Sequence, residues 1–315
     1  MKHSFPIRSF TSLLAVVLCA APLWAHEAGS AADAMQWSWE PFVIGPILGT
    51  LLLYAIGIGR MWRRSARRPR VWSVVAFAGG ILALIAALDS PIHLLGGQLF
   101  WVHMTQHELL MLVSAPLLVL SRPVVPFLWS LPSNWRETLG RFPKLGPWRK
   151  FWLFASSAAA AWTIHAVALW LWHAPALFEA ALHSEAVHAF QHVCFLGSAL
   201  LFWWSLVHGR HGRMAYGAAI VYVFTTAAHN SILGALLTFA PRAWYPSYVR
   251  TAPNWNLTAI QDQQLGGLIM WVPAGTLLLI VGLALVAAWV GESQKRYQYT
   301  RMTALLKHSE ALDAH

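Results

Sequence analysis

The chain has 315 residues, of which 57% are apolar and only 11% are charged, and its mean hydropathy is +0.51. This composition excludes an ordinary soluble globular protein. The net charge of +10 does not indicate nucleic-acid binding, because the basic residues are scattered over several short segments instead of forming one patch. We therefore expect an integral membrane protein that is surrounded by the lipid bilayer and has no nucleic-acid partner.

The N-terminus has the features of a secretory signal peptide. Two basic residues, Lys2 and Arg8, precede an apolar stretch, and the small residue Ala25 closes it. We predict a signal peptide over residues 1–25, cleaved after Ala25, and a periplasmic tail over residues 26–41. The alternative is an uncleaved anchor helix, because a bulky leucine lies three positions before the cut.

The rest of the chain is organised as apolar runs separated by short polar segments. A run of roughly 18 to 25 residues is long enough to cross about 30 Å of hydrocarbon as a helix. We predict an all-α membrane domain over residues 42–290 and a cytoplasmic tail over residues 291–315. The seven predicted transmembrane helices lie near 42–60, 71–88, 101–120, 151–172, 188–207, 214–236 and 267–290.

The distribution of basic residues gives the expected orientation, since cytoplasmic segments are enriched in Lys and Arg. Of the 22 Lys and Arg residues, two lie in the predicted signal peptide, 18 would lie inside, and two, Arg242 and Arg250, would lie outside if the mature chain begins outside. We therefore predict an N-out, C-in topology.

The sequence contains the pattern HxxQH twice, each time at the outer start of a predicted span. The first copy comprises His103, Gln106 and His107, and the second comprises His188, Gln191 and His192. Residues four apart share one face of a helix and lie about 6 Å apart along its axis, so each copy presents two imidazoles to one neighbour. Two such pairs at equal depth predict a metal site near the outer face.

Further candidate ligands lie at similar depth. His173 ends the fourth predicted span, His229 lies in the outer half of the sixth, and His93 lies in an outer loop. Polar side chains within the bilayer should face the bundle interior. The competing interpretation is that each imidazole only joins helices by hydrogen bonding. This explanation is strongest for isolated histidines such as His165 and His229, and weakest for the duplicated pairs.

The ligand types favour copper. Imidazole binds copper, zinc and iron, and thioether sulfur adds a preference for Cu(I). Met111 continues the stripe of His103 and His107 one turn further, and Met270 lies at the outer end of the last span, although methionine in such helices is more often a packing residue. After signal cleavage Cys194 is the single cysteine, which excludes a disulfide or a thiolate metal site within the chain.

The sequence resembles the caa(3)-type CtaG cytochrome c oxidase assembly proteins over roughly residues 42–290. The resemblance rests on DSPIHLL followed by HMTQHELLMLVSAPLLVL, on WLWHAPALFEAALHSEAVHAFQH followed by FWW, on AHNSILGALLTF leading to WYPSY, and on DQQLGGLIMWVPAG. Matched residue by residue, it points to His93, His103, His107, His173, His188, His192 and His229, and to Asp262, Gln263 and Gln264 beside Met270.

The resemblance implies a polytopic protein of the bacterial inner membrane that assists maturation of the oxidase through its copper and is not an enzyme. Oxidase subunits would be its partners, and a periplasmic copper chaperone is a further candidate. Three other functions stay open: a b-type haem protein, a copper transporter, and a diiron desaturase or hydroxylase. The last class also uses HxxxH boxes, but it normally has an HxxHH box as well, which this sequence lacks. A haem could take at most one axial ligand from each HxxQH copy, since ligands only about 6 Å apart cannot serve two stacked haems.

Overall fold

The computed structural model describes residues 33–64, 69–141, 146–212 and 214–313, and every regular element in these ranges is a helix. The prediction of an all-α fold is therefore confirmed for these residues. The predicted signal peptide lies outside the described residues, so its cleavage stays a prediction.

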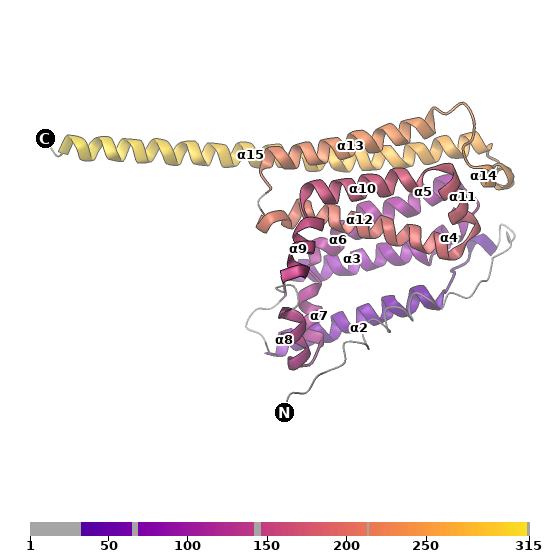
Figure 1. The fold of residues 1–315 in the computed structure, drawn as a ribbon, viewed down its shortest axis with the longest axis horizontal. Coiled ribbons are helices and arrows are strands. Elements are labelled where there is room, and N and C mark those ends of the chain that lie inside the picture. Colours follow the sequence, from indigo (N-terminus) through magenta and orange to yellow (C-terminus); the bar gives the residue numbers. More distant parts are fainter. Residues whose placement is uncertain (1–32, 65–68, 142–145, 213, 314–315) are drawn as a thin grey trace.

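Within the described ranges, six helical segments are long and apolar enough to cross a membrane. Figure 1 shows them running along a common direction. They are α2 (Pro41–Arg64), α3 (Val71–Leu88), the continuous segment Phe100–Ser121, α12 (Glu185–Gly212), α13 (Tyr216–Thr238) and α15 (Ala259–Asp313).

The fourth predicted span, 151–172, is not one straight helix. It is divided into α9 (Gly146–Ala155) and α10 (Ala158–Trp172), which meet at an angle of 63°. Ser157 caps the start of α10 by accepting a hydrogen bond from the Ala160 amide, and Ser156 donates to the Trp152 carbonyl at the end of α9. The 15 residues of α10 span only about 22 Å. The described residues therefore contain six candidate spans, or seven if the bent pair crosses as one.

The third span changes its helical type in the middle. It consists of α5 (Phe100–Glu108), a π-helical segment η2 (Leu109–Ser114) and α6 (Ala115–Ser121). The wider π turn leaves the Met111 carbonyl to accept a hydrogen bond from Trp203 Nε1 at 2.9 Å. Because π turns shift the register of a helix, Met111 does not simply continue the face of His103 and His107.

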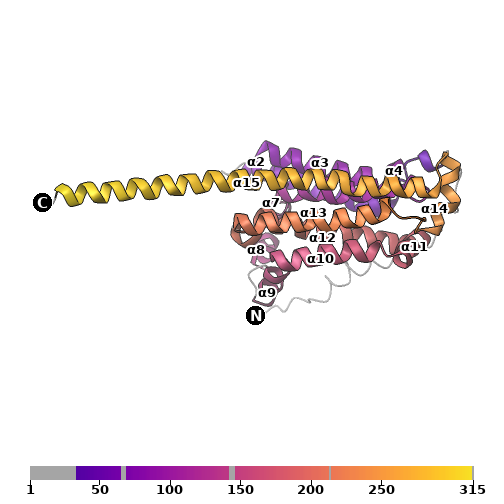
Figure 2. The same cartoon turned by 90° about the horizontal axis from the view of Figure 1, so that it is seen from above.

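Short helices cover the two ends of the bundle (Figures 1 and 2). One end carries α4 (Pro91–Gly96), α11 (Pro175–His183), α14 (Pro246–Thr251) and the 3₁₀ turn η4 (Ala252–Trp255), and the other carries α7 (Val124–Ser130), α8 (Ser133–Arg141) and α9. Proline opens α4, α11 and α14, as expected at a first helical position. The turn η1 (Asp33–Met35) precedes α2.

Two assignments made from the sequence are corrected at the first of these ends. His93 lies in α4 and not in a loop. The segment between the sixth and seventh predicted spans is not a plain loop either, because it contains α14, η4 and the first turns of α15. That helix begins early because Thr258 and Gln261 form a reciprocal capping box, each side chain accepting the backbone amide hydrogen of the other.

The last helix is also much longer than the predicted span 267–290. α15 runs for 55 residues to Asp313 and projects far beyond the bundle in both views (Figures 1 and 2). Polar residues end the apolar run but not the helix, and Glu292 pairs with Arg296 one turn later at 3.4 Å.

Close packing of α13 against α15 depends on glycine. A Cβ atom on Gly267 would lie 2.8 Å from the Gly234 carbonyl oxygen, and one on Gly234 would lie 2.6 Å from the Trp271 Cβ. The two backbones therefore approach more closely than any larger residue allows. This contact fixes the start of α15 beside the histidine-bearing helices.

Candidate metal site

Six histidines from four elements meet at one end of the bundle. Neighbouring rings have centroids 4.2 to 6.3 Å apart, with His188 and His192 at 4.2 Å, and His103 and His107 at 4.4 Å. His103 stacks on His188 at 5.1 Å, which joins the two HxxQH copies. We call the set the histidine cluster; its members are His93 on α4, His103 and His107 on α5, His173 at the end of α10, and His188 and His192 on α12.

The spacing of the rings suits shared coordination. Imidazoles that bind one ion through nitrogens about 2 Å away have ring centres on the order of 5 Å apart. The contacts between His103 and His188 at 5.1 Å and between His107 and His192 at 5.6 Å lie in this range. Among the described residues, however, the group whose ligand atoms all lie within 4.8 Å of one another is Glu40, His93 and Glu185, so binding of one ion by both copies would need their side chains to move.

The cluster is deeply buried, yet many of its nitrogens lack partners. His103, His107 and His173 are at most 2% exposed, and His192 is 7% exposed. Within the described part of the chain, no group in hydrogen-bonding geometry reaches either nitrogen of His103 and His107, or Nε2 of His173, His188 and His192. Buried polar atoms without partners are costly, so these nitrogens are the groups of the cluster best placed to bind a ligand.

His173 is oriented as a metal-ligating histidine would be. Its Nδ1–H donates to the Leu169 carbonyl at 2.7 Å, which leaves the Nε2 lone pair directed away from its own helix. Such a bond to a backbone carbonyl fixes the tautomer and the ring orientation of many metal ligands. The Tyr245 hydroxyl donates to the His173 carbonyl at 2.9 Å and holds the end of α10 in place.

The segments that connect the helices at this end of the bundle hold the cluster in place through buried polar contacts. The Asp262 carboxylate accepts the amide hydrogens of Phe100 and Trp101 at 2.8 and 3.0 Å, and so caps α5 from the start of α15. Tyr248 donates its hydroxyl to the Gly96 carbonyl at 2.8 Å, and burial raises the pKa of this hydroxyl well above its ordinary value, so it stays a donor. Gln263 joins Trp244 to the Leu237 carbonyl. Asp262 and Gln263 therefore position the site from outside it.

The two glutamines of the HxxQH copies behave differently. Gln106 Nε2 donates to the Ala87 carbonyl at 2.7 Å and to His93 Nδ1 at 3.0 Å. Gln191 is fully buried beside His103, and neither its amide nitrogen nor its oxygen has a partner in hydrogen-bonding geometry among the described residues. The first glutamine therefore joins α5 to the Ala87 carbonyl and to His93, whereas the second lies beside His103 within the cluster.

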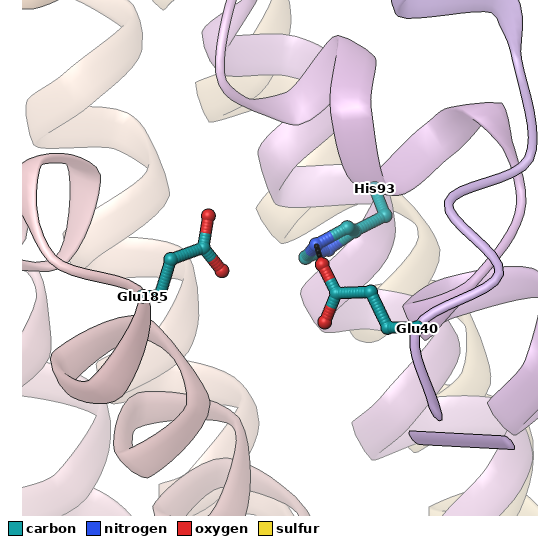
Figure 3. A group of neighbouring side chains, drawn as sticks. All are labelled: Glu40, His93 and Glu185. Atoms are coloured by element: carbon teal, nitrogen blue, oxygen red, sulfur yellow. Dashed lines mark ion pairs between the residues drawn. The ribbon is translucent and has the colours of Figure 1, made fainter. Parts of the chain in front are cut away.

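The edge of the cluster carries a mixed site of one histidine and two carboxylates. Ligand atoms of Glu40, His93 and Glu185 all lie within 4.8 Å of one another, and His93 Nε2 is 3.8 Å from Glu40 Oε1. Figure 3 shows Glu40 directly beside the His93 ring, and Glu185 on a separate helix with its carboxylate turned toward both. Because Nδ1 of His93 accepts from Gln106, the ring proton is on Nε2 and faces Glu40. We call these three residues the rim site.

Three other residues predicted from the sequence lie apart from the cluster's ring contacts. His229 packs edge-on against Trp162 at 5.4 Å. Met111 lies in the π segment, and Met270 is 1% exposed in the apolar core. His165 is held by Ser198 Oγ at 3.1 Å, as the helix-joining interpretation expects.

The prediction from sequence missed Glu108 as an interior residue. This residue lies within the third span, is only 8% exposed, and its Oε2 has no hydrogen-bond partner among the residues the structure describes. The available signal was a single acidic residue inside the apolar run ELLMLV. An ionisable residue within a membrane span is a candidate functional residue in its own right.

Comparison with known proteins identifies relatives of the chain. The family model for the cytochrome c oxidase caa3 assembly factor matches residues 52–292. An uncharacterized protein of Mycobacterium bovis is 28% identical over 268 residues, and one of Mycobacterium leprae is 27% identical over 270 residues. These alignments cover 82% of this chain but only 40% of each relative. No solved structure matches the chain.

Proposed function

Because the chain belongs to the cytochrome c oxidase caa3 assembly factor family, we propose that it binds copper at the histidine cluster and supplies it to the maturing oxidase. The observation that carries this proposal is the set of buried imidazole nitrogens without partners. Five histidines, His103, His107, His173, His188 and His192, offer such nitrogens, and neutral imidazole is a good copper ligand. Binding and transfer of the ion need no catalytic step, so we do not propose an enzyme.

The placement of the cluster supports delivery within the membrane. It lies at the end of the bundle to which the distribution of Lys and Arg assigns the periplasm, while its ligands come from membrane-length helices. We propose that copper enters from the periplasm, from a chaperone or from solution, and leaves to an oxidase subunit in the same bilayer. The host membrane would be the bacterial inner membrane.

The orientation has its own test, motivated by the 18 to 2 division of basic residues. A reporter that is active only outside the cytoplasm should be silent when fused after Lys307 and active when inserted near Thr251. Activity after Lys307 would contradict the N-out, C-in arrangement.

The packing around the histidines favours an ion over a haem. The rings of Phe178 and Phe195 lie 4.8 and 4.5 Å from those of His103 and His107. A porphyrin between two axial histidines would have to displace these side chains and separate the stacked imidazoles. A Soret band in the absorption spectrum of the purified protein would nevertheless show that it binds haem, and haem would then take the place of copper in the proposal.

Deletion of the gene separates the remaining functions. We expect the oxidase polypeptide to be made but short of copper, with excess copper in the medium partly restoring respiration by mass action. A transporter would instead change total cell copper and leave the oxidase loaded. Measuring oxidase copper, oxidase haem and cell copper distinguishes these outcomes. A fully metallated oxidase in the deletion strain would contradict the assembly function.

A further inference from the structure

A second polar site lies deeper in the bundle than the histidine cluster. A cavity of about 20 Å³ is lined by Glu108, Met111, His165, Thr226 and Asn230 together with apolar side chains. This volume has room for about one water molecule or one small ion. His165 precedes His173 by eight residues on α10, which places it about 12 Å further from the outer end.

The helices that form the histidine cluster also form this cavity. The third span contributes His103 and His107 above and Glu108 and Met111 below. On α12, His192 is followed by Ser198, which holds His165, and by Phe202, which lines the cavity. The two sites are therefore consecutive levels of one interior column.

The polar atoms that line the cavity either lack hydrogen-bond partners among the described residues or are oriented to bind a ligand. Glu108 Oε2 and Asn230 Oδ1 are buried without hydrogen-bond partners among the described residues. Ser198 Oγ donates to the Phe195 carbonyl and so accepts the Nδ1–H of His165, which leaves the Nε2 lone pair of His165 available. The Met111 side chain adds a thioether to the lining.

The net charge of the side chains that line the cavity indicates which species the cavity would bind. A single carboxylate in a membrane interior is strongly unfavourable unless a cation or a proton neutralises it. One monovalent metal ion balances one carboxylate, and the imidazole and thioether donors are those that favour Cu(I).

We propose that Glu108, His165 and Asn230 form a second, deeper Cu(I) site, with Met111 as a soft contact, to which copper passes from the histidine cluster. This inference rests on the proposed function, since it takes the same ion from the same entrance. It extends that function by adding a second binding site at mid-membrane depth, where an oxidase subunit within the bilayer could receive the ion from the side.

The test is the number of copper ions held by the full-length protein. The purified chain is equilibrated without oxygen against Cu(I) buffered by a competing chelator, and bound copper is measured per chain. We expect about two ions for the wild type, about one for Glu108→Gln, which keeps the size but removes the charge, and about one for the double variant His107→Ala/His192→Ala. His165→Ala should resemble Glu108→Gln and serves as the second variant if Glu108→Gln does not fold.

A matched control is Glu137→Gln, because Glu137 is an exposed residue of α8 paired with Arg141. It should retain both ions. Unchanged stoichiometry and affinity in Glu108→Gln and His165→Ala would overturn the deeper site and indicate a neutral carboxyl beside a water molecule. A wild type that holds one ion, lost only in the histidine-cluster variant, would reject the deeper site and leave the proposed function intact, whereas a wild type without copper would reject both.

Discussion

The two HxxQH copies have the same spacing but different surroundings. In both, the paired rings are in contact, at 4.4 Å for His103 and His107 and at 4.2 Å for His188 and His192. The first copy is tied to α3 and α4 by its glutamine, is capped by Asp262, and is followed by a π turn. The second lies in the continuous helix α12, and its glutamine has no partner in hydrogen-bonding geometry among the described residues.

This difference shows which properties of the site follow from the motif itself and which follow from the residues around it. The i, i+4 spacing places two imidazoles on one helix face wherever the helix lies. Whether a glutamine is a structural tie or a free donor depends on groups that come from elsewhere in the chain, such as the Ala87 carbonyl. The first copy is therefore the braced half of the cluster, and the second is the half that is free to adjust to an ion.

The largest expected effect comes from removing one ligand from each copy. His107→Ala and His192→Ala should each abolish most copper binding at the histidine cluster, and the double change should add little, because ligands of one site are not additive. Bound copper per chain and the copper dissociation constant are the measurements. His183→Ala is the matched control, since His183 is exposed and bonded to its own helix. Losses that simply add would indicate two independent sites.

Substitutions of the two glutamines should affect different properties: Gln106 should matter mainly for stability and Gln191 mainly for copper binding. Gln106→Ala removes a buried hydrogen bond to the Ala87 carbonyl and should lower the free energy of unfolding by about 1–3 kcal/mol. Gln191→Ala removes a side chain without such a bond and should leave the unfolding free energy nearly unchanged while weakening copper binding. Thermal unfolding of both variants in detergent, with and without copper, checks the contrast. Equal destabilisation of the apo forms would show that the two glutamines have the same role.

The next smaller effect is expected at the cap of α5, which is a further difference between the two HxxQH copies. Asp262→Ala removes the acceptor of two backbone amide hydrogens, and loss of a helix cap typically costs about 0.5–2 kcal/mol. We expect a lower unfolding temperature and weaker copper binding, because α5 carries His103 and His107. Asp262→Asn should recover part of both, since its side-chain oxygen still accepts one of the two bonds. A normal copper affinity in Asp262→Ala would show that the cap does not position the ligands.

The sequence predicted most helices and the shared depth of the histidines, because apolar length and helical spacing are local properties. The break between α9 and α10 and the π segment after Glu108 were missed, since both depend on where backbone groups find partners. The start of α15 was within reach, because Thr258 and Gln261 have the spacing of a capping box. The burial of Glu108 was harder to see, since it arises from packing of the third span against α10, α12 and α13.

The smallest effect is expected at the rim site. Glu40 lies 3.8 Å from His93 and is partly exposed, so the contact between this carboxylate and the neutral ring should contribute less than about 1 kcal/mol to stability. The carboxylates of Glu40 and Glu185 instead raise the local concentration of cations beside His188 and His192, which should accelerate entry. Glu40→Gln combined with Glu185→Gln should slow copper loading severalfold at low salt and leave the final copper content unchanged. Rapid-mixing measurements at low and high ionic strength test this, because added salt should remove the difference in rate between wild type and variant. A reduced final copper content would mean that the rim carboxylates are ligands of the stored ion. The copper held by the two HxxQH copies would then also be bound by the rim site.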